Sequence, residues 1–363
     1  MTATEQTVLD ALKSVIDPNT GKDFVSSKAI KNLSVSDGDV SFDVELGYPA
    51  KSQIPGFRKE LIAAVKSAPG VVNVSVNLNV KIVAHAVQRG VALLPGVKNV
   101  VAVASGKGGV GKSTTAVNLA LALAAEGARV GLLDADIYGP SIPMMMGIDG
   151  KPESSDGQTM EPMENYGVQV MSIGFLVPAD EAMIWRGPMA TQALEQLLRQ
   201  TNWKDLDYLI VDMPPGTGDI QLTLSQRVPM TGAVIVTTPQ DIALLDARKG
   251  IKMFEKVSVP ILGIVENMAV HVCSQCGHIE HIFGADGGKK MAAEYKADYL
   301  GALPLAMQIR LQADSGHPSV VSDPDSEVAG LYKGVARKVA LAIAAKNKDF
   351  SNKFPSIKIS KDS

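Results

Sequence analysis

The sequence has little of several features that would assign it to a particular class of protein. Two cysteines in 363 residues are too few for a disulfide scaffold, which suits a reducing compartment. The formal net charge of −3 gives no electrostatic reason to expect a nucleic-acid partner. No apolar run approaches the roughly 20 residues that a membrane-spanning helix needs, and the N-terminus lacks the pattern of a signal peptide. We therefore expect a cytoplasmic protein without nucleic-acid or membrane partners.

What the sequence does contain is typical of a globular α/β protein. Hydrophobic residues make up 46% and aromatic residues only 5%, and there are 33 glycines. A core of Val, Ile, Leu and Ala with many tight turns fits that balance. At about 150 residues per domain, the length allows two or three domains. We expect a mostly parallel sheet flanked by helices, preceded by a smaller α+β domain.

The smaller domain is predicted to occupy residues 1–87. Apolar residues at helical spacing come first, and Asp37-Gly38 is then a hairpin signal between two strands. A helix over residues 55–66 and a strand of alternating polarity over residues 72–80 follow. The predicted order is α-β-β-α-β. No catalytic combination of residues stands out in it, which favours an accessory role.

The remaining boundaries follow from changes in composition. Residues 88–98 include two glycines and a proline and are predicted to be a linker. His85, close to it, is interpreted as an ordinary surface or boundary residue. The larger domain is predicted to occupy residues 99–345, and residues 346–363 are a polar tail.

A phosphate-binding loop opens the larger domain. Residues 100–104 form a short apolar strand, and residues 105–114 read SGKGGVGKST before an Ala- and Leu-rich helix. This is the pattern G-x-x-x-x-G-K-[ST] between a strand and a helix. Its glycines let backbone N–H groups surround phosphate oxygens at a helix N-terminus, where Lys112 meets the β- and γ-phosphates and Ser113 binds Mg²⁺. The residues expected to bind ATP are Gly106, Lys107, Gly108, Gly109, Val110, Gly111, Lys112, Ser113 and Thr114.

The second lysine of this loop, Lys107, is not needed by a plain phosphate-binding loop. The string KGGVGKS from Lys107 to Ser113 resembles the deviant Walker A motif of the MinD, ParA, ArsA and nitrogenase iron-protein class. In that class the first lysine reaches the nucleotide of the partner subunit. The resemblance implies a homodimer with nucleotide between the subunits, and a catalytic role for Lys107.

Two further apolar strands end in carboxylates. The first ends at Asp134 and is followed by Ala135 and Asp136, and the second ends at Asp212 before a glycine-rich loop that runs to Asp219. Carboxyl ends of parallel strands meet at one edge of a sheet, so these side chains are expected beside the phosphate-binding loop. Asp212 fits the Walker B position that holds Mg²⁺. By resemblance, Asp136 positions or activates the attacking water and belongs to the Mg²⁺ site, and Asp134 is structural or an indirect magnesium partner.

The rest of the domain is predicted from alternating strands and helices. Strands are expected at residues 233–237, 260–266 and 299–303, with a helix from residue 242 that Asp241 caps and a closing helix over residues 326–345. Asn267 follows the second of these strands. In the family an asparagine here recognises adenine, and the alternative is a turn asparagine without a ligand.

The two cysteines are spaced Cys273-x-x-Cys276, so both thiolates can face one metal. A tetrahedral site needs four ligands, which leaves three interpretations. Two cysteines from each of two subunits make a Cys₄ site for a [4Fe–4S] cluster, which agrees with the dimer that Lys107 implies. Zinc is the second, with His271, His278 or His281 completing the site or with the ligands again shared across the dimer. A redox-active pair of thiols is the third, although the flanking sequence does not resemble that class.

Nearly the whole chain resembles the Mrp/ApbC family of iron–sulfur cluster carrier ATPases. The motifs that carry the resemblance are residues 106–113, DADIYGPS at 134–141, DMPPGTGD at 212–219 and the paired cysteines. The resemblance implies ATP hydrolysis coupled to transfer of a [4Fe–4S] cluster to apoproteins, and assembly scaffold proteins as partners. The small first domain resembles an iron–sulfur assembly domain. A spatial-organisation ATPase like MinD or ParA and a zinc-stabilised ATPase scaffold are the alternatives.

Overall fold

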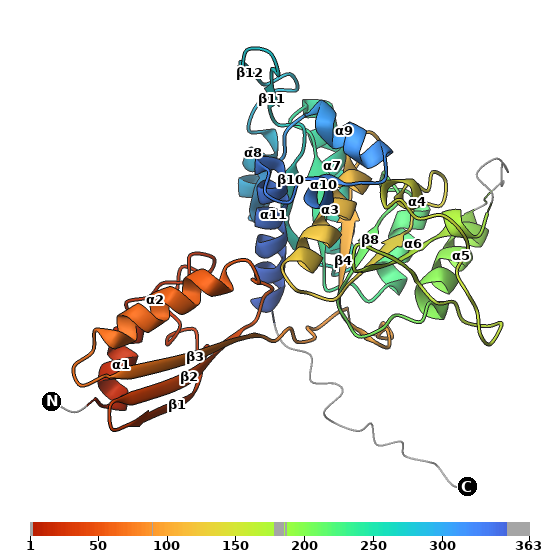
Figure 1. Ribbon diagram of the computed structural model, residues 1–363. Helices are drawn as coiled ribbons and strands as arrows, with labels where there is room; N and C mark the ends of the chain where they lie inside the picture. The colour runs from red at the N-terminus through yellow and green to blue at the C-terminus, as the bar shows by residue number, and fades with distance from the viewer. Residues whose placement is uncertain (1–2, 89, 178–184, 186, 347–363) are drawn as a thin grey trace, which may run out of the picture.

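The computed structural model describes residues 3–88, 90–177, 185 and 187–346. Within this part of the chain the strands form a three-stranded sheet, an eight-stranded sheet and a small two-stranded hairpin (Figure 1). The N-terminal residues form the first sheet, and the described elements from Val97 onward form the second sheet, its helices and the small hairpin. The predicted combination of a small α+β region and a large helix-flanked sheet is confirmed.

The N-terminal sheet has the predicted order of elements. The elements are α1 (Glu5–Leu12), β1 (Ile30–Ser36), β2 (Asp39–Leu46), α2 (Ile54–Lys66) and β3 (Asn73–Val80). Asp37 and Gly38, between β1 and β2, both have positive φ, as the tight turns of hairpins require. The helices α1 and α2 bury their apolar residues against one face of the sheet, where Leu12, Phe57 and Leu61 are fully or almost fully buried.

The large sheet is parallel except at one edge. In spatial order its strands are β13 (Tyr299–Ala302), β10 (Ile261–Glu266), β9 (Gly232–Thr237), β4 (Val97–Ala104), β8 (Leu206–Asp212), β5 (Val130–Asp134), β7 (Val168–Ser172) and β6 (Met163–Asn165). Only β6 runs antiparallel to its neighbour. The chain leaves β4 toward β5 and later returns to β9 on its other side. Such a reversal of strand order opens a crevice at the carboxyl ends of the central strands, where ligands bind in open α/β sheets.

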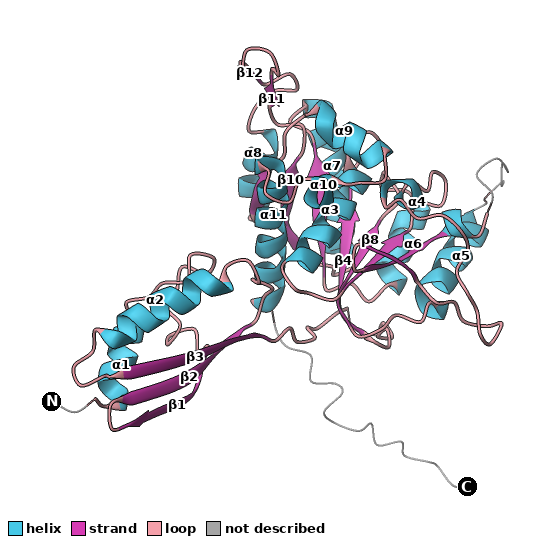
Figure 2. Cartoon of the chain, in the orientation of Figure 1, coloured by secondary structure: helices cyan, strands magenta, loops and turns pink. Residues whose placement is uncertain are grey.

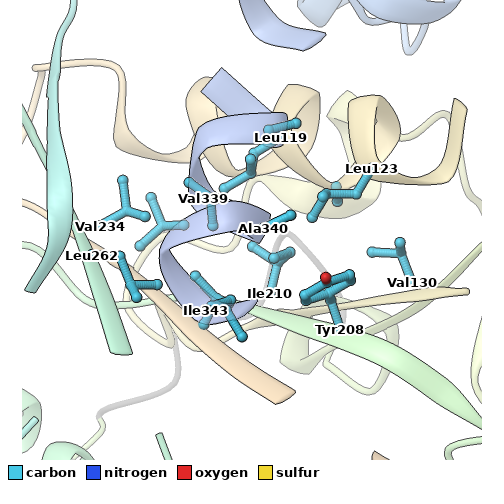
Figure 3. Close-up of a cluster of buried hydrophobic side chains, with 14 of the residues drawn as sticks. Leu119, Leu123, Val130, Tyr208, Ile210, Val234, Leu262, Val339, Ala340 and Ile343 are labelled. Carbon is cyan, nitrogen blue, oxygen red and sulfur yellow. The ribbon is translucent and has the colours of Figure 1, made fainter. Parts of the chain in front are cut away.

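Helices cover both faces of this sheet (Figure 2). They are α3 (Lys112–Ala125), α4 (Ile142–Met145), α5 (Gly187–Gln200), α6 (Asp219–Arg227), α7 (Asp241–Lys256), α8 (Gly287–Tyr295), α9 (Met307–Asp314), α10 (Ser319–Ser322) and α11 (Glu327–Ala344), with a 3₁₀ turn, η1, at Ile173–Phe175. Leu119 of α3 and Val339 and Ile343 of α11 pack over Ile210 and Val234 of the strands (Figure 3). No described helix is both long and apolar enough to cross a membrane.

The structure differs from the sequence predictions at several local points. His85 is buried, with its Nδ1 3.1 Å from the Asn99 side-chain oxygen. Of the two places predicted for it, surface or boundary, the surface is therefore wrong. Asp241 is the first residue of α7 and Gln240 is the N-cap, which corrects the predicted cap. The strand β4 begins at Val97, earlier than its apolar run, because pairing with β8 continues through polar positions. Of the predicted tail, residues 347–363 lie outside the described residues.

The two sheets are joined at the C-terminal end of α3. The Glu126 carboxylate, 1% exposed, accepts hydrogen bonds from the Ser52 backbone N–H at 3.0 Å and the Ser52 hydroxyl at 2.7 Å. The guanidinium of Arg337 in α11 forms an ion pair with the same carboxylate at 2.8 Å. The Glu126 backbone carbonyl also accepts the N–H of Lys51 at 3.1 Å. The loop between β2 and α2 is thereby fixed to α3 and α11, two of the helices that cover the large sheet.

Candidate functional site

The phosphate-binding loop connects β4 to α3. Gly109 and Gly111 have φ angles of +81° and +82°, a region that strains residues with a side chain. Space is also restricted, because a Cβ at Gly111 would lie 2.1 Å from the Asn267 amide nitrogen. A Cβ at Gly106 would lie 2.1 Å from the backbone of Asp246 in α7. Gly106 and Gly111 are therefore needed for close packing, and Gly109 and Gly111 for the turn.

Three polar side chains of the site contact one another directly. The Lys112 ammonium lies 2.7 Å from one carboxylate oxygen of Asp212, and the Ser113 hydroxyl donates to the other at 2.6 Å. Asp212 is fully buried and Lys112 is 6% exposed. Lys112 and Asp212 are 100 residues apart in sequence, and the pairing of β4 with β8 brings them together. The predicted phosphate lysine and two of the three predicted magnesium residues, Ser113 and Asp212, thus form one hydrogen-bonded cluster.

The other two carboxylates lie beside this cluster. Asp134 pairs in register with Asp212 across β5 and β8, and burial together with the Asp212 carboxylate raises the pKa of Asp134 to about 7. Asp136 places a carboxylate oxygen 3.8 Å from the Lys112 ammonium. Burial raises the pKa of Asp136 as well, while Lys112 opposes that shift. The structure therefore brings all the predicted charged residues of the loop and the strand ends to one place, apart from Lys107.

The paired cysteines lie on a separate, exposed hairpin at the top of the molecule in Figure 1. Its strands are β11 (His271–Val272) and β12 (Ile279–Glu280), and the N–H of Cys273 donates to the His278 carbonyl at 2.9 Å. Gly277, with φ of +71°, closes the turn by donating to the Cys273 carbonyl. Both cysteines are free thiols, and Cys276 is exposed. Hydrogen bonds from the backbone N–H groups of Gln275 and Cys276 lower the pKa of Cys273.

Comparison with known proteins places these two sites in one family. The sequence model of the NUBPL iron-transfer P-loop NTPases matches residues 96–340, which contain the phosphate-binding loop, both carboxylate motifs and the cysteine hairpin. The chain belongs to this family. A second model, that of an iron-sulfur cluster assembly protein, matches residues 5–76. The predicted resemblances of the large and of the small region are both confirmed.

Individual relatives agree with this assignment. The chain is 59% identical over 275 residues to an iron-sulfur cluster carrier protein of Pseudomonas fragi, which covers 75% of this chain and 96% of that protein. An iron-sulfur cluster carrier protein of Synechocystis sp. is 46% identical over 348 residues, 93% of this chain and 97% of the relative. Among solved structures, a nucleotide-binding protein of Archaeoglobus fulgidus in complex with ADP superposes with a TM-score of 0.57 at 38% identity. The match covers 64% of this chain and 91% of that one.

Lys107 and Asn267 have different surroundings in this P-loop NTPase. The Lys107 side chain is half-buried and has no ion-pair partner among the described residues. Asn267 is buried at the carboxyl end of β10, and its amide donates to the Val110 carbonyl of the phosphate-binding loop at 2.8 Å. The chain continues from Asn267 directly into the cysteine hairpin. Asn267 therefore connects the phosphate-binding loop physically to the segment that bears the thiols.

Two of the three histidines near the cysteines, His271 and His281, have a ring nitrogen in contact with a backbone carbonyl, whereas the ring of His278 lies 3.9 Å from the Glu280 carboxylate. Nδ1 of His271 lies 3.0 Å from the Leu305 carbonyl, and Nδ1 of His281 lies 2.9 Å from the Ala269 carbonyl. A carbonyl only accepts, so both rings carry their proton on Nδ1 and are oriented by it. Within the described residues no group of three or more His, Cys, Asp and Glu side chains is arranged to hold a metal ion. Cys273 and Cys276 therefore have no third His, Cys, Asp or Glu side chain arranged with them as a metal ligand in the described part of the chain.

Ser172 lies in none of the sequence motifs, although its hydroxyl donates to Asp134 at 3.1 Å. The one available signal was its place at the carboxyl end of an apolar strand, the same position that Asp134 and Asp212 hold in theirs. A link between two loops was likewise not predicted, in which the Gly216 N–H donates to the Ser105 carbonyl at 3.0 Å. No local pattern indicates that pairing, because the two residues meet only once the strands are side by side.

Proposed function

We propose that this chain hydrolyses ATP and carries a [4Fe–4S] cluster between two copies of itself, for transfer to apoproteins. The observation that supports it best is the position of two sites at one edge of one sheet. The Lys112–Asp212–Ser113 cluster forms the first site, and the hairpin of Cys273 and Cys276 the second. Asn267, which contacts the phosphate-binding loop, leads straight into that hairpin. A change at the nucleotide thus reaches the thiols through a short stretch of backbone.

ATP binds, in this proposal, on the backbone N–H groups of the loop, with Lys112 on the β- and γ-phosphates. Ser113 and Asp212 present hydroxyl and carboxylate oxygens, the hard donors that suit Mg²⁺, so the residues present fit that ion. When bound, Mg²⁺ neutralises phosphate charge. Asn267 contacts the adenine ring with the polar atoms that remain beside its bond to Val110. The proposed contacts are Gly106, Lys107, Gly108, Gly109, Val110, Gly111, Lys112, Ser113, Thr114 and Asn267.

Asp136 is proposed to orient the attacking water and to share the Mg²⁺ site. Its carboxylate is close to the Lys112 ammonium, hence to the position that the γ-phosphate takes. Lys107 is proposed to reach the nucleotide of the partner copy, which its lack of an ion-pair partner in the described chain permits. The ammonium would then stabilise charge that develops on the phosphates during hydrolysis.

A homodimer is proposed because the same edge of the molecule exposes large apolar side chains. A patch of exposed apolar side chains is typical of a protein-binding surface. They lie on the loop after β5, on α4, on the first turns of α7, on and just after the cysteine hairpin, and on α9: Tyr138, Met144, Ile242, Leu245, Val272, Ile279, Ile282, Met307 and Leu311. A second copy placed there would bring two more cysteines to the first pair and complete four thiolates.

The remaining parts of the proposal concern the surroundings of the protein. Free thiols at Cys273 and Cys276 are suited to a reducing cytoplasm. The proposed partners are apoproteins that receive the cluster and scaffold proteins that supply it. We propose a division of the chain into residues 1–87, a linker from residue 88 to 96, the ATPase region 97–345 and the tail 346–363. The predicted linker end at residue 98 is corrected, because Val97 and Lys98 belong to β4.

The experiment is to determine iron, acid-labile sulfide and zinc per dimer in protein purified and reconstituted without oxygen. About four iron and four sulfide per dimer are expected. Cys276→Ser should lose them, whereas Ser274→Ala, on the same hairpin, should keep them. A full cluster in the Cys276→Ser variant, or stoichiometric zinc without sulfide, would contradict the proposal. Zinc would favour the scaffold alternative.

Sedimentation with liposomes and with DNA in the presence of ATP separates the carrier from an ATPase that organises membranes or DNA. The proposal predicts that the protein stays in the supernatant in both cases. ATP-dependent sedimentation without cluster binding would instead favour a MinD- or ParA-like function.

A further inference from the structure

The loop after β5 rests on the end of β7. Ser172, the last residue of β7, pairs in register with Asp134, and both side chains are fully buried. The Ser172 hydroxyl oxygen accepts the N–H of Gly174 at 3.0 Å, so its single proton is free to go to the Asp134 carboxylate, 3.1 Å away. The hydroxyl therefore has a fixed direction, set by the backbone that follows it.

The Asp134 carboxylate in turn holds both ends of the loop. One oxygen accepts the N–H of Asp136 at 3.1 Å, and the other accepts the N–H of Ile142 at 3.2 Å in addition to the Ser172 hydroxyl. The residues between them carry Asp136, whose side chain lies near Lys112. A rotation of the Asp134 carboxylate would consequently move the backbone from which the Asp136 side chain extends.

A second, purely steric contact supports the same loop. A Cβ at Gly174 would lie 3.1 Å from Pro143 at the start of α4, and 3.3 Å both from Pro140 of the loop and from the Ser172 hydroxyl oxygen. Those distances are tighter than ordinary contact, so a side chain at Gly174 would displace its neighbours by a few tenths of an ångström. Ser172 and Gly174 thus support the loop in two ways, one polar and one steric.

Burying the Asp134 carboxylate costs free energy of folding, so a purely structural role does not explain why an aspartate stands at this position. An apolar side chain at the end of a buried strand would pack there without desolvating a carboxylate. Asp134 instead accepts hydrogen bonds from the loop and from Ser172. Neither Ser172 nor Gly174 contacts Lys112, Ser113 or Asp212, so their effect on the nucleotide site is indirect.

We propose that Ser172 and Gly174 form a seat for the loop 135–142, and that Ser172 is a positioning residue for ATP hydrolysis. It acts by orienting Asp134 and, through it, Asp136. This inference rests on the proposed hydrolytic function and on the proposed role of Asp136. It predicts that damage to the seat slows the chemical step and leaves ATP binding almost unchanged, because the phosphate-binding loop is not touched.

The test compares steady-state phosphate release and ATP binding for Ser172→Ala, Gly174→Ala and a control, Ser225→Ala. Ser225 is also fully buried, and its hydroxyl donates to one carbonyl, that of Gln221 in α6, so the chemical change is matched. We expect kcat to fall about tenfold in Ser172→Ala, less than the roughly hundredfold that a 1 Å misplacement can cause. KM and the Kd for ATP should stay within about twofold of the unmodified protein. Gly174→Ala should likewise lower kcat and leave KM and the Kd for ATP almost unchanged. Ser225→Ala should change none of these quantities.

Equal kcat values in Ser172→Ala, Ser225→Ala and the unmodified protein would overturn the positioning role. So would a parallel loss of ATP affinity and kcat, which indicates general damage to the fold. Gly174→Ala, checked by circular dichroism, decides the question if Ser172→Ala does not fold. The unmodified protein and Lys112→Ala are measured alongside: phosphate release that does not depend on Lys112 would overturn the proposed function itself, and this inference with it.

Discussion

At the scale of single residues, the site is organised by a buried carboxylate that serves two partners. Asp212 is fully buried, and the ammonium of Lys112 compensates its charge while Ser113 donates to its second oxygen. In the proposed function Lys112 also binds the phosphates of ATP, so the lysine would share or exchange this contact. We therefore expect the pair to affect both stability and activity.

Replacement of Lys112 by alanine should abolish hydrolysis and also destabilise the protein. The substitution leaves the Asp212 charge buried without a cation in contact, which costs about 3 kcal/mol or more in comparable pairs. Urea unfolding and phosphate release measure the two effects. Adding Asp212→Asn to the Lys112→Ala variant removes the uncompensated charge and should restore part of the stability. An unfolding midpoint for Lys112→Ala equal to that of the unmodified protein would show that the pair is not formed in solution.

Cys273 should react as a thiolate at a lower pH than an ordinary cysteine. Backbone N–H groups of Gln275 and Cys276 stabilise its negative charge and lower the pKa of the thiol. A lowered pKa means that the reactive form is already present below the usual titration range and grows as pH rises toward it. The rate of iodoacetamide alkylation in cluster-free Cys276→Ser protein should have its midpoint below about 8.5, the value of a free cysteine. A midpoint at or above that value would contradict the hairpin geometry.

At the scale of elements, the cysteine hairpin is a short, exposed structure held by few bonds. Two residue pairs join β11 to β12, and the turn between them depends on Gly277 in the left-handed region. Asn267 and the carbonyls that orient His271 and His281 tie its base to the sheet. We therefore expect substitutions at the turn to disturb the geometry of the hairpin more than substitutions at its base.

Gly277→Ala should loosen cluster binding without changing hydrolysis by the cluster-free protein. An alanine in the left-handed region costs about 1 kcal/mol, which corresponds to roughly a fivefold loss of occupancy or faster loss of the cluster. The rate of cluster loss is measured as iron release to a chelator, which is followed by absorbance. The matched control is Gly157→Ala, since Gly157 also has positive φ and open space around its Cβ position but lies on another loop. Equal cluster loss in the two variants would argue against a special role of the turn.

At the scale of the whole molecule, the two ends of α3 have different tasks. Its N-terminus carries Lys112, and Glu126 just beyond its C-terminus holds the N-terminal region through Lys51 and Ser52. A helix of 14 residues is about 21 Å long, so the N-terminal region is fixed well away from the nucleotide site. Figure 1 shows it at the opposite end of the molecule from the cysteine hairpin.

Removal of the Ser52 hydroxyl should weaken the attachment of the N-terminal region. A hydrogen bond to a buried carboxylate contributes about 1.5–3 kcal/mol, so Ser52→Ala should open this contact at least about tenfold more often. Hydrogen exchange at the Lys51 amide reports it, because that N–H bonds across the junction to Glu126. Ser67→Ala, whose hydroxyl bonds within its own helix end, is the control. Unchanged exchange at Lys51 in Ser52→Ala would show that the carboxylate contact does not hold the junction.

By itself, the sequence determined what depends on local spacing. The order α-β-β-α-β, the phosphate-binding loop between a strand and α3, the strands that end at Asp134 and Asp212, and the paired cysteines could all be read from patterns within about 15 residues. The family followed from those motifs together. Their physical basis is backbone geometry, which glycines and alternating apolar residues impose locally.

Only the tertiary structure decided which distant residues share a site. The contact of Lys112 with Asp212, the seat of Ser172 under Asp134, and the attachment of Ser52 to Glu126 each join segments that are far apart in the chain. The burial of His85 has the same origin, since Asn99 covers it from another element. Strand order and register fix these pairings, and both result from packing of the whole sheet rather than from any local preference.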